Sequence, residues 1–144
     1  MSSDTSFTAI ETADLRAFAG AMIPASAPYK MPGADDELIF ADVVNSLGRD
    51  LDDVKTALKG LAGIAALAPE KRLTFANAFR AGNGSLALTI ARVILLCYYR
   101  DDRVMRTLGQ EPRSPFPKGH VVEQGDWALL DPVKARGPIW RKVS

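Results

Sequence analysis

Hydrophobic residues recur at helical spacing along most of the first 109 residues. Thr8 and Glu11 have the spacing of a capping box, which is typical of a helix N-terminus. The helix that starts there is expected to end at Pro24, because proline is poorly tolerated inside a helix. Its apolar positions are Leu15, Phe18 and Met22.

Three more helices are predicted between residues 35 and 82. The second begins near Asp35 or Asp36, whose negative charges suit a helix N-terminus. A third follows the joint at Arg49-Asp50, and a fourth has Pro69 in its first position and stops at Gly82. The residues expected to point inward are Ile39, Val43, Val44 and Leu47 in the second helix. In the third helix they are Leu51, Val54, Leu58, Leu61 and Ala65, and in the fourth they are Leu73, Ala76 and Phe79.

The stretch 85–109 contains the most continuous apolar run. Only Ser85, Thr89 and Arg92 interrupt its first half, and a helix that is hydrophobic on all sides is normally buried. The run is too short for a bilayer, which requires about 20 residues. We therefore expect the central helix of a bundle here. Arg92 should pair with an acid of the second or third helix, with Asp42 and Asp53 as candidates, since an unpaired buried charge is costly.

The ends of this stretch also carry capping signals. Asn83 is a plausible cap for the long helix, and Asp101 or Asp102 for a renewed helical turn that ends at Gly109. Strand-like alternation is not found in these residues. The predicted fold is all-α: a small bundle of about five helices over residues 1–109.

Residues 110–144 have a different character. Five prolines exclude long helices, yet both tryptophans and several aliphatic residues lie here, in a composition unlike a disordered tail. Two short helical turns are predicted, one capped by Asp126 and one with Asp131 as cap, Pro132 in the first turn and Gly137 after its end. We expect a long, proline-rich, mostly irregular C-terminal arm that packs on the bundle, on a partner, or on both.

Charge is nearly balanced overall, at +1, but it is divided along the chain. Residues 1–53 contain ten acids and three bases, and residues 54–144 contain seven acids and fifteen bases. Attraction between the halves within the fold is the favoured interpretation. Arg100, Arg103 and Arg106 share one helical side, but Asp101 and Asp102 lie among them and would repel a nucleic-acid backbone. A salt-bridged or partner-contacting face is expected instead.

The chain offers few residues for chemistry of its own. A single cysteine, Cys97, permits neither an internal disulfide nor a thiolate metal cluster, and it is expected to be buried and inert. His120 is the only histidine, and the sequence places neither an acid nor a nucleophile to work with it. The acids at 35–37 are better explained as a helix start than as metal ligands. No catalytic, cofactor-binding or metal-binding residue is predicted in this chain.

Several segments resemble the gluconate 2-dehydrogenase subunit 3 family, the small or gamma subunits of FAD-dependent sugar and sugar-acid dehydrogenases. The similar segments are Leu15–Pro24, Pro32–Ala34, Tyr98–Val104, Leu108–Gly109, Pro115–Gly119 and Val122–Pro132. In that family FAD and the catalytic residues belong to a large subunit of the glucose–methanol–choline type, and a cytochrome c subunit often accepts the electrons. The small subunit is a helical companion that supports maturation or stability of the large one.

The resemblance implies a non-catalytic subunit of a dehydrogenase that oxidises a sugar, sugar acid or glycoside. The alternative is a helical interaction module or nucleic-acid-binding protein without a redox role. Many family members begin with a twin-arginine export signal that this sequence lacks, so a cytoplasmic complex is expected, or a periplasmic one if a partner carries the chain across. The residues expected at the partner interface are Tyr99, Arg100, Arg103, Phe116, Trp127, Leu130 and Trp140.

Overall fold

The computed structural model describes residues 7–114, 116–119, 121, 123–138 and 140. Within these residues the protein is all-α, because its only β-type pairing is an isolated bridge between Ser26 and Met31. The chain divides into two compact units, residues 1–112 and residues 113–144. No helix in the described part of the chain is long and apolar enough to cross a membrane.

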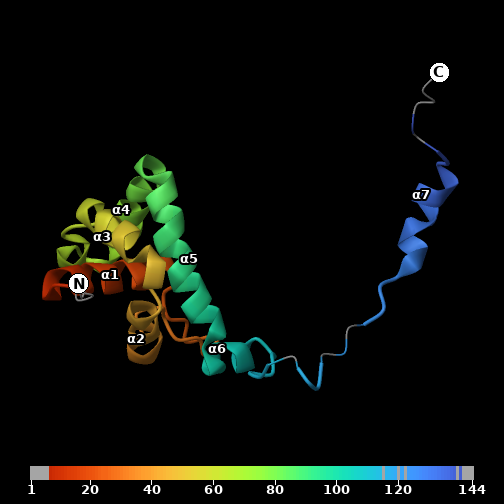
Figure 1. The fold of residues 1–144 in the computed structure, drawn as a ribbon, viewed down its shortest axis with the longest axis horizontal. Helices are drawn as coiled ribbons and strands as arrows, with labels where there is room; N and C mark the ends of the chain where they lie inside the picture. The colour runs from red at the N-terminus through yellow and green to blue at the C-terminus, as the bar shows by residue number, and fades with distance from the viewer. Residues whose placement is uncertain (1–6, 115, 120, 122, 139, 141–144) are drawn as a thin grey trace. The chain divides into compact units, whose positions relative to one another are not determined.

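The first unit is a bundle of short helices. They are α1 (Ala9–Met22), α2 (Glu37–Asn45), α3 (Leu51–Gly60), α4 (Pro69–Gly82), α5 (Gly84–Arg100) and α6 (Asp102–Thr107), as Figure 1 shows. Short 3₁₀ turns η1 (Gly48–Asp50) and η2 (Ile64–Ala66) lie before and after α3. In the second unit, the 3₁₀ turn η3 (Trp127–Leu130) leads directly into α7 (Asp131–Ala135).

Most helix ends lie where the capping residues predicted them. The N–H of Glu11 donates to Oγ1 of Thr8 at 3.2 Å and the N–H of Thr8 donates to Oε2 of Glu11 at 2.9 Å, which completes the capping box. Asp36 caps α2 and Asp101 caps α6 through their carboxylates. Gly109 follows α6 with φ of 74°, a left-handed conformation that favours glycine.

Two other predicted caps make no side-chain capping bond to the helix that they were expected to cap. Asn83 occupies the N-cap position of α5, but its amide instead donates to the carbonyl of Phe79 at 3.1 Å and so closes the end of α4. Asp131 is the first residue of α7 rather than its cap. Its carboxylate lies 3.4 Å from Nζ of Lys134, one turn further along the short helix.

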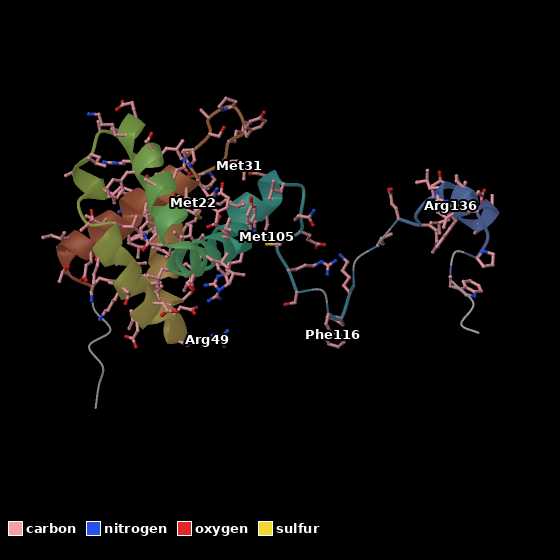
Figure 2. The ribbon with its side chains drawn as sticks, turned by 90° about the horizontal axis from the view of Figure 1, so that it is seen from above. Met22, Met31, Arg49, Met105, Phe116 and Arg136 are labelled. Atoms are coloured by element: carbon pink, nitrogen blue, oxygen red, sulfur yellow. The ribbon has the colours of Figure 1, made fainter. Side chains whose placement is uncertain are left out.

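The core of the first unit lies where α5 packs against α2, α3 and α4, and where α1 packs against α3 and α4. The rings of Phe18 and Phe79 meet edge to face, with centroids 6.1 Å apart, and link α1 to α4. Met22 lies among the packed side chains at the end of α1 (Figure 2). The largest fully buried side chains are Leu15, Ile39, Leu61, Ile64, Ile90, Ile94, Val43, Val54, Val104 and Cys97.

A buried acid, which the sequence analysis did not identify, fixes the link between α3 and α4. The carboxylate of Asp14 on α1 accepts hydrogen bonds from the N–H groups of Gly63 and Ala65, at 3.0 and 2.9 Å. From α4, the Arg72 guanidinium donates to the carbonyls of Ala65 and Leu67, at 2.9 and 3.0 Å. The turn η2 is therefore held by an acid on one side and a base on the other.

Candidate partner-binding surface

The long helix α5 is not buried on every side, which corrects the expectation of a fully enclosed central helix. One face, with Ala87, Ile90, Val93, Ile94, Cys97 and Tyr98, is buried. The other face leaves Leu88, Leu95, Leu96 and Tyr99 exposed by 71%, 40%, 57% and 53%. Leu88, Leu95 and Tyr99 follow one another at intervals of seven and four residues, so they form a continuous apolar stripe along the helix.

Arg92 lies within this stripe and pairs with an acid other than the two predicted. Its guanidinium is 2.7 Å from Asp50 in η1, next to the start of α3, and 43% of its side chain is exposed. The predicted partners Asp42 and Asp53 were wrong, and the charge is not deeply buried. Its aliphatic stem continues the apolar stripe while its charge remains near water.

An apolar groove of about 580 Å³ runs beside the stripe, between α1, α4 and α5. Phe18, Ala76 and Ala87 are buried at its base. Leu73 and Leu95 form parts of its walls, with 54% and 40% of their surfaces exposed. Leu73 was expected to point into the core, but it faces this groove.

Tyr99 lines one end of the groove and is held in place by its neighbour. The rings of Tyr98 and Tyr99 pack edge to face, with centroids 5.2 Å apart and an interplanar angle of 88°. The hydroxyl of Tyr98 is itself fixed, because it donates to the carbonyl of Pro32 at 3.0 Å. Tyr99 is thus a preorganised exposed aromatic, the kind of side chain that often anchors a protein interface.

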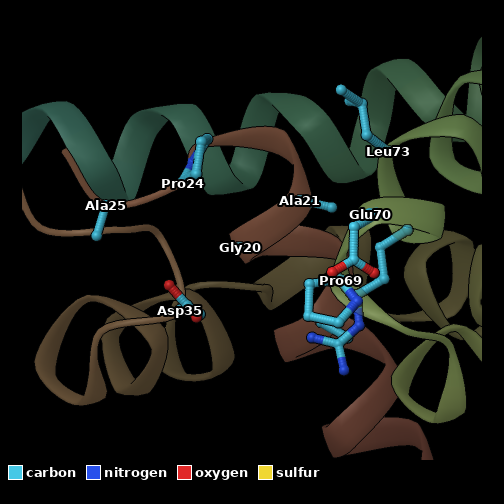
Figure 3. A pocket seen from close by; sticks show the side chains of 10 residues that line it. Gly20, Ala21, Pro24, Ala25, Asp35, Pro69, Glu70 and Leu73 are labelled. Atoms are coloured by element: carbon cyan, nitrogen blue, oxygen red, sulfur yellow. The ribbon is translucent and has the colours of Figure 1, made fainter.

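A second hollow, of about 500 Å³, continues the groove toward the loop after α1. Pro24 and Leu73 line both hollows, so the two are contiguous. Figure 3 shows Asp35 on one side of the second hollow and Glu70 near Pro69 on the other. The surface therefore changes from apolar at Leu95 and Tyr99 to one of mixed charge, because Arg72 lines the second hollow together with the two acids.

Arg100 and Arg103, both expected at a partner interface, form ion pairs within the chain. Nε of Arg100 is 2.6 Å from Oδ2 of Asp42, and Arg103 binds Asp36 at 2.6 Å and Asp101 at 3.0 Å. These pairs hold α2 against α5 and α6. The hydrogen bonds from Arg100 and Arg103 lower the pKa values of Asp42 and Asp36, respectively.

The predicted attraction between the acidic and basic halves is confirmed at these pairs, since Asp36, Asp42 and Asp50 all bind arginines from the second half. Arg106 pairs with Asp102 one turn away in α6, at 2.9 Å. The arginine row that a nucleic-acid backbone would need is therefore already neutralised by carboxylates.

Within its own unit, the arm leaves its described aromatic residues uncovered. Phe116, Trp127 and Trp140 have exposed fractions of 87%, 62% and 73%, and Leu130 is 42% exposed. The carboxylate of Asp126 accepts from the N–H of Ala128 at 3.0 Å and caps η3, as predicted. Large exposed apolar side chains on short, capped turns suit a recognition segment. His120, Pro115, Val122 and Ile139 lie outside the described residues.

The described residues assemble no group of three or more potential metal ligands. Cys97 is buried as predicted, and burial raises the pKa of its thiol, which keeps it protonated and unreactive at neutral pH. This surface can take part in recognition, through burial of apolar side chains along α5 and through the charged side chains of the second hollow.

Comparisons with known proteins identify no relative. The chain matches no protein-family model, no curated protein and no solved structure.

Proposed function

We propose that this protein is the non-catalytic small subunit of a heteromeric FAD-dependent dehydrogenase that oxidises a sugar, sugar acid or glycoside. The observation that carries the proposal is the exposed apolar surface of α5, with Leu88, Leu95, Leu96 and Tyr99 uncovered on a well-packed bundle. Contiguous exposed apolar patches of this kind mark protein interfaces. The sequence segments that resemble gluconate 2-dehydrogenase subunit 3 supply the identity of the partner.

In this proposal FAD is bound by the large subunit, of the glucose–methanol–choline type, and a cytochrome c is a candidate electron acceptor. The small subunit covers an apolar surface of the large one and so stabilises its folded, flavin-loaded state. Anything that binds only the folded state shifts the folding equilibrium toward it. We propose a cytoplasmic complex, or a periplasmic one if the large subunit is exported together with this chain.

Purification of the tagged native chain tests this function. The complex should contain a second, larger polypeptide, show the visible absorbance of flavin, and reduce an artificial electron acceptor in the presence of one sugar or sugar acid. A screen of sugars, sugar acids and glycosides would then name the substrate. Recovery of the chain with a partner that binds no flavin would overturn the proposal.

A helical interaction module without a redox role is the second candidate, because the same apolar surface favours it. The two candidates differ in one measurement, the flavin content of the purified complex. Nucleic-acid binding has less support, since Arg100, Arg103 and Arg106 are each paired with a carboxylate.

A further inference from the structure

The last helix of the first unit, α6, is held by few buried side chains. Among its six described residues Val104 alone is buried, and Leu108, just after its end, is 50% exposed. The preceding helix α5 has six buried side chains. Segments with few buried apolar side chains open at a lower free energy than the rest of a protein. Opening of α6 therefore does not require unfolding of the bundle.

The backbone provides a hinge immediately before α6. Asp101 is the single residue between α5 and α6, and its backbone is extended, with φ of −65° and ψ of 128°. Hinges are often such positions at the end of an element, where a change in φ or ψ moves one element as a body. Rotation at Asp101 can thus move α6 while α5 stays packed in the core.

One side chain, Arg103, joins α6 to the start of α2. Its Nη2 and Nη1 donate to the two carboxylate oxygens of Asp36, at 2.6 and 3.2 Å. Its Nη2 and Nε also donate to the carboxylate of Asp101, at 3.0 and 3.1 Å. The carboxylate of Asp36 is at the same time the cap of α2. Opening of α6 therefore has to break a bidentate pair with the residue that begins α2.

Residues 32–36, which lead into α2, are held by side chains of α1, α5 and α6. The hydroxyl of Tyr98 on α5 donates to the carbonyl of Pro32 at 3.0 Å. Nε of Arg16 on α1 donates to the carbonyl of Asp35 at 2.9 Å. The contact from α6 is the bidentate pair just described. Asp35 also lines the hollow of about 500 Å³, so movement of residues 32–36 would change the rim of that hollow.

We infer that α6 is a hinged helix that opens by rotation at Asp101, and that Arg103 couples this opening to residues 32–36. The bidentate pair holds the helix and these residues together in the closed position and releases both in the open one. Coupling of this kind acts equally in both directions. A partner that holds α6 open would loosen residues 32–36, and a ligand that fixes residues 32–36 would favour the closed helix. The inference does not depend on the reaction of the partner, so it can fail while the proposed function holds.

Amide hydrogen exchange of the full chain, followed for each residue by NMR, tests the separate opening of α6. Asp36→Asn keeps a capping side chain on α2 but removes the ion pair with Arg103. Asp42→Asn is the matched control, because it removes the ion pair between α2 and Arg100 on α5. Asp36→Asn should speed exchange of the Met105 amide in α6 by about fivefold, since the open helix is then favoured. Asp42→Asn should leave exchange of Met105 unchanged, because the pair that it removes is intact whether α6 is open or closed.

The amides of α5 supply the comparison within each variant. Amides in the core exchange when the whole unit unfolds, so both variants should speed them in proportion to the stability that is lost. If α6 had no opening of its own, Met105 would follow the α5 amides in both variants. Faster exchange of Met105 in Asp42→Asn, or unchanged exchange of Met105 in Asp36→Asn, would overturn the inference.

The coupling to residues 32–36 has its own readout at Ala34. This residue is fully buried, and its N–H donates to the carbonyl of Ile23 at 2.9 Å. Arg103→Ala should speed exchange of the Ala34 amide by about fivefold, because residues 32–36 lose their contact with α6. Arg106→Ala removes an ion pair within α6 and should leave exchange of Ala34 unchanged. Wild-type exchange of Ala34 in Arg103→Ala, or equal effects of the two variants, would overturn the inference.

Discussion

At the residue scale, the single side chain of Asp14 holds the turn between α3 and α4 in place. It is only 3% exposed, and both of its carboxylate oxygens accept backbone hydrogen bonds that hold the turn η2. Asp14→Ala should lower the free energy of unfolding by about 2 to 4 kcal/mol, because two N–H groups lose their charged acceptor. Asp14→Asn keeps one carbonyl oxygen and should cost less. Urea unfolding of the three proteins checks the order, and an alanine variant as stable as wild type would contradict it.

Gly60 is the second residue whose identity is dictated by contact. A Cβ at this position would lie 2.8 Å from Cε2 of Phe79, whose ring packs on Phe18. Gly60→Ala should therefore lower the melting temperature, at a cost of about 1 to 3 kcal/mol from overpacking. Gly82→Ala is the matched control at the end of α4, where a Cβ meets open space, and it should be neutral or slightly stabilising. Equal melting temperatures for the two variants would refute this explanation.

At the element scale, the ion-paired carboxylates where α2 meets α5 and α6 make the free energy of unfolding depend on pH in the acidic range. Hydrogen bonds from Arg103 and Arg100 lower the pKa values of Asp36 and Asp42. Burial would raise the pKa of Asp101, but hydrogen bonds from the Arg103 side chain and from backbone N–H groups lower it overall. In the unfolded chain these groups recover a pKa of about 3.9, so the unfolded state binds more protons than the folded state in acid.

The free energy of unfolding should therefore be constant near neutral pH and fall as the pH drops to about 3.9 and below. Arg103→Ala should reduce stability at neutral pH and flatten this decline, because Asp36 and Asp101 lose the partner that lowers their pKa values. Arg106→Ala removes an exposed pair within α6 and should cost no more than about 0.5 kcal/mol. Denaturant unfolding between neutral and acidic pH measures these effects. An unchanged acid dependence in Arg103→Ala would contradict the assignment.

The helices themselves were predictable because their ends carry strong local signals. The capping box at Thr8, the cap Asp36 and the proline at Pro69 each act over a few residues, so the sequence contains what sets those helix ends. The partner of Arg92 was not predictable in the same way. It depends on how α5 is rotated against α3, which is a property of packing rather than of local sequence.

The exposed stripe on α5 was missed for a related reason. A helix that is apolar on all sides is predicted to be buried. The local sequence does not distinguish the face that the bundle leaves uncovered. Asp14 did leave a signal, because it lies four residues before Phe18 on the inward side of α1. A polar residue on the core face of a helix indicates a buried hydrogen-bond acceptor. Of the predicted interface residues, Tyr99 is exposed on the first unit, and Phe116, Trp127 and Trp140 are uncovered within the second. Their place at an interface stays a prediction.

At the scale of the whole molecule, the two units should contribute separately to folding stability and to partner binding. The first unit has its own hydrophobic core, whose buried apolar residues lie between residues 15 and 104. A chain that ends at Pro112 should therefore remain helical and unfold cooperatively at nearly the melting temperature of the full protein. Circular dichroism tests this directly. Loss of helical structure in the shortened chain would mean that residues 113–144 are part of the folding unit.

The shortened chain also tests the role of the arm. If Phe116, Trp127 and Trp140 anchor the large subunit, removal of residues 113–144 should reduce recovery of the flavoprotein complex by about tenfold or more, because aromatic anchors dominate interface energies. Full recovery with the shortened chain would place the whole interface on the first unit.

The central claim is that this chain is needed to obtain an active flavoprotein while contributing no catalytic group of its own. The most direct measurement is to produce the large subunit with and without this chain, and to compare its soluble yield, flavin content and sugar-dependent reduction of an electron acceptor. Soluble, flavin-loaded, active enzyme should appear only with co-production, and the small chain purified alone should be colourless and inactive. Equal activity of the large subunit without this chain, or flavin and turnover in the small chain alone, would contradict the claim.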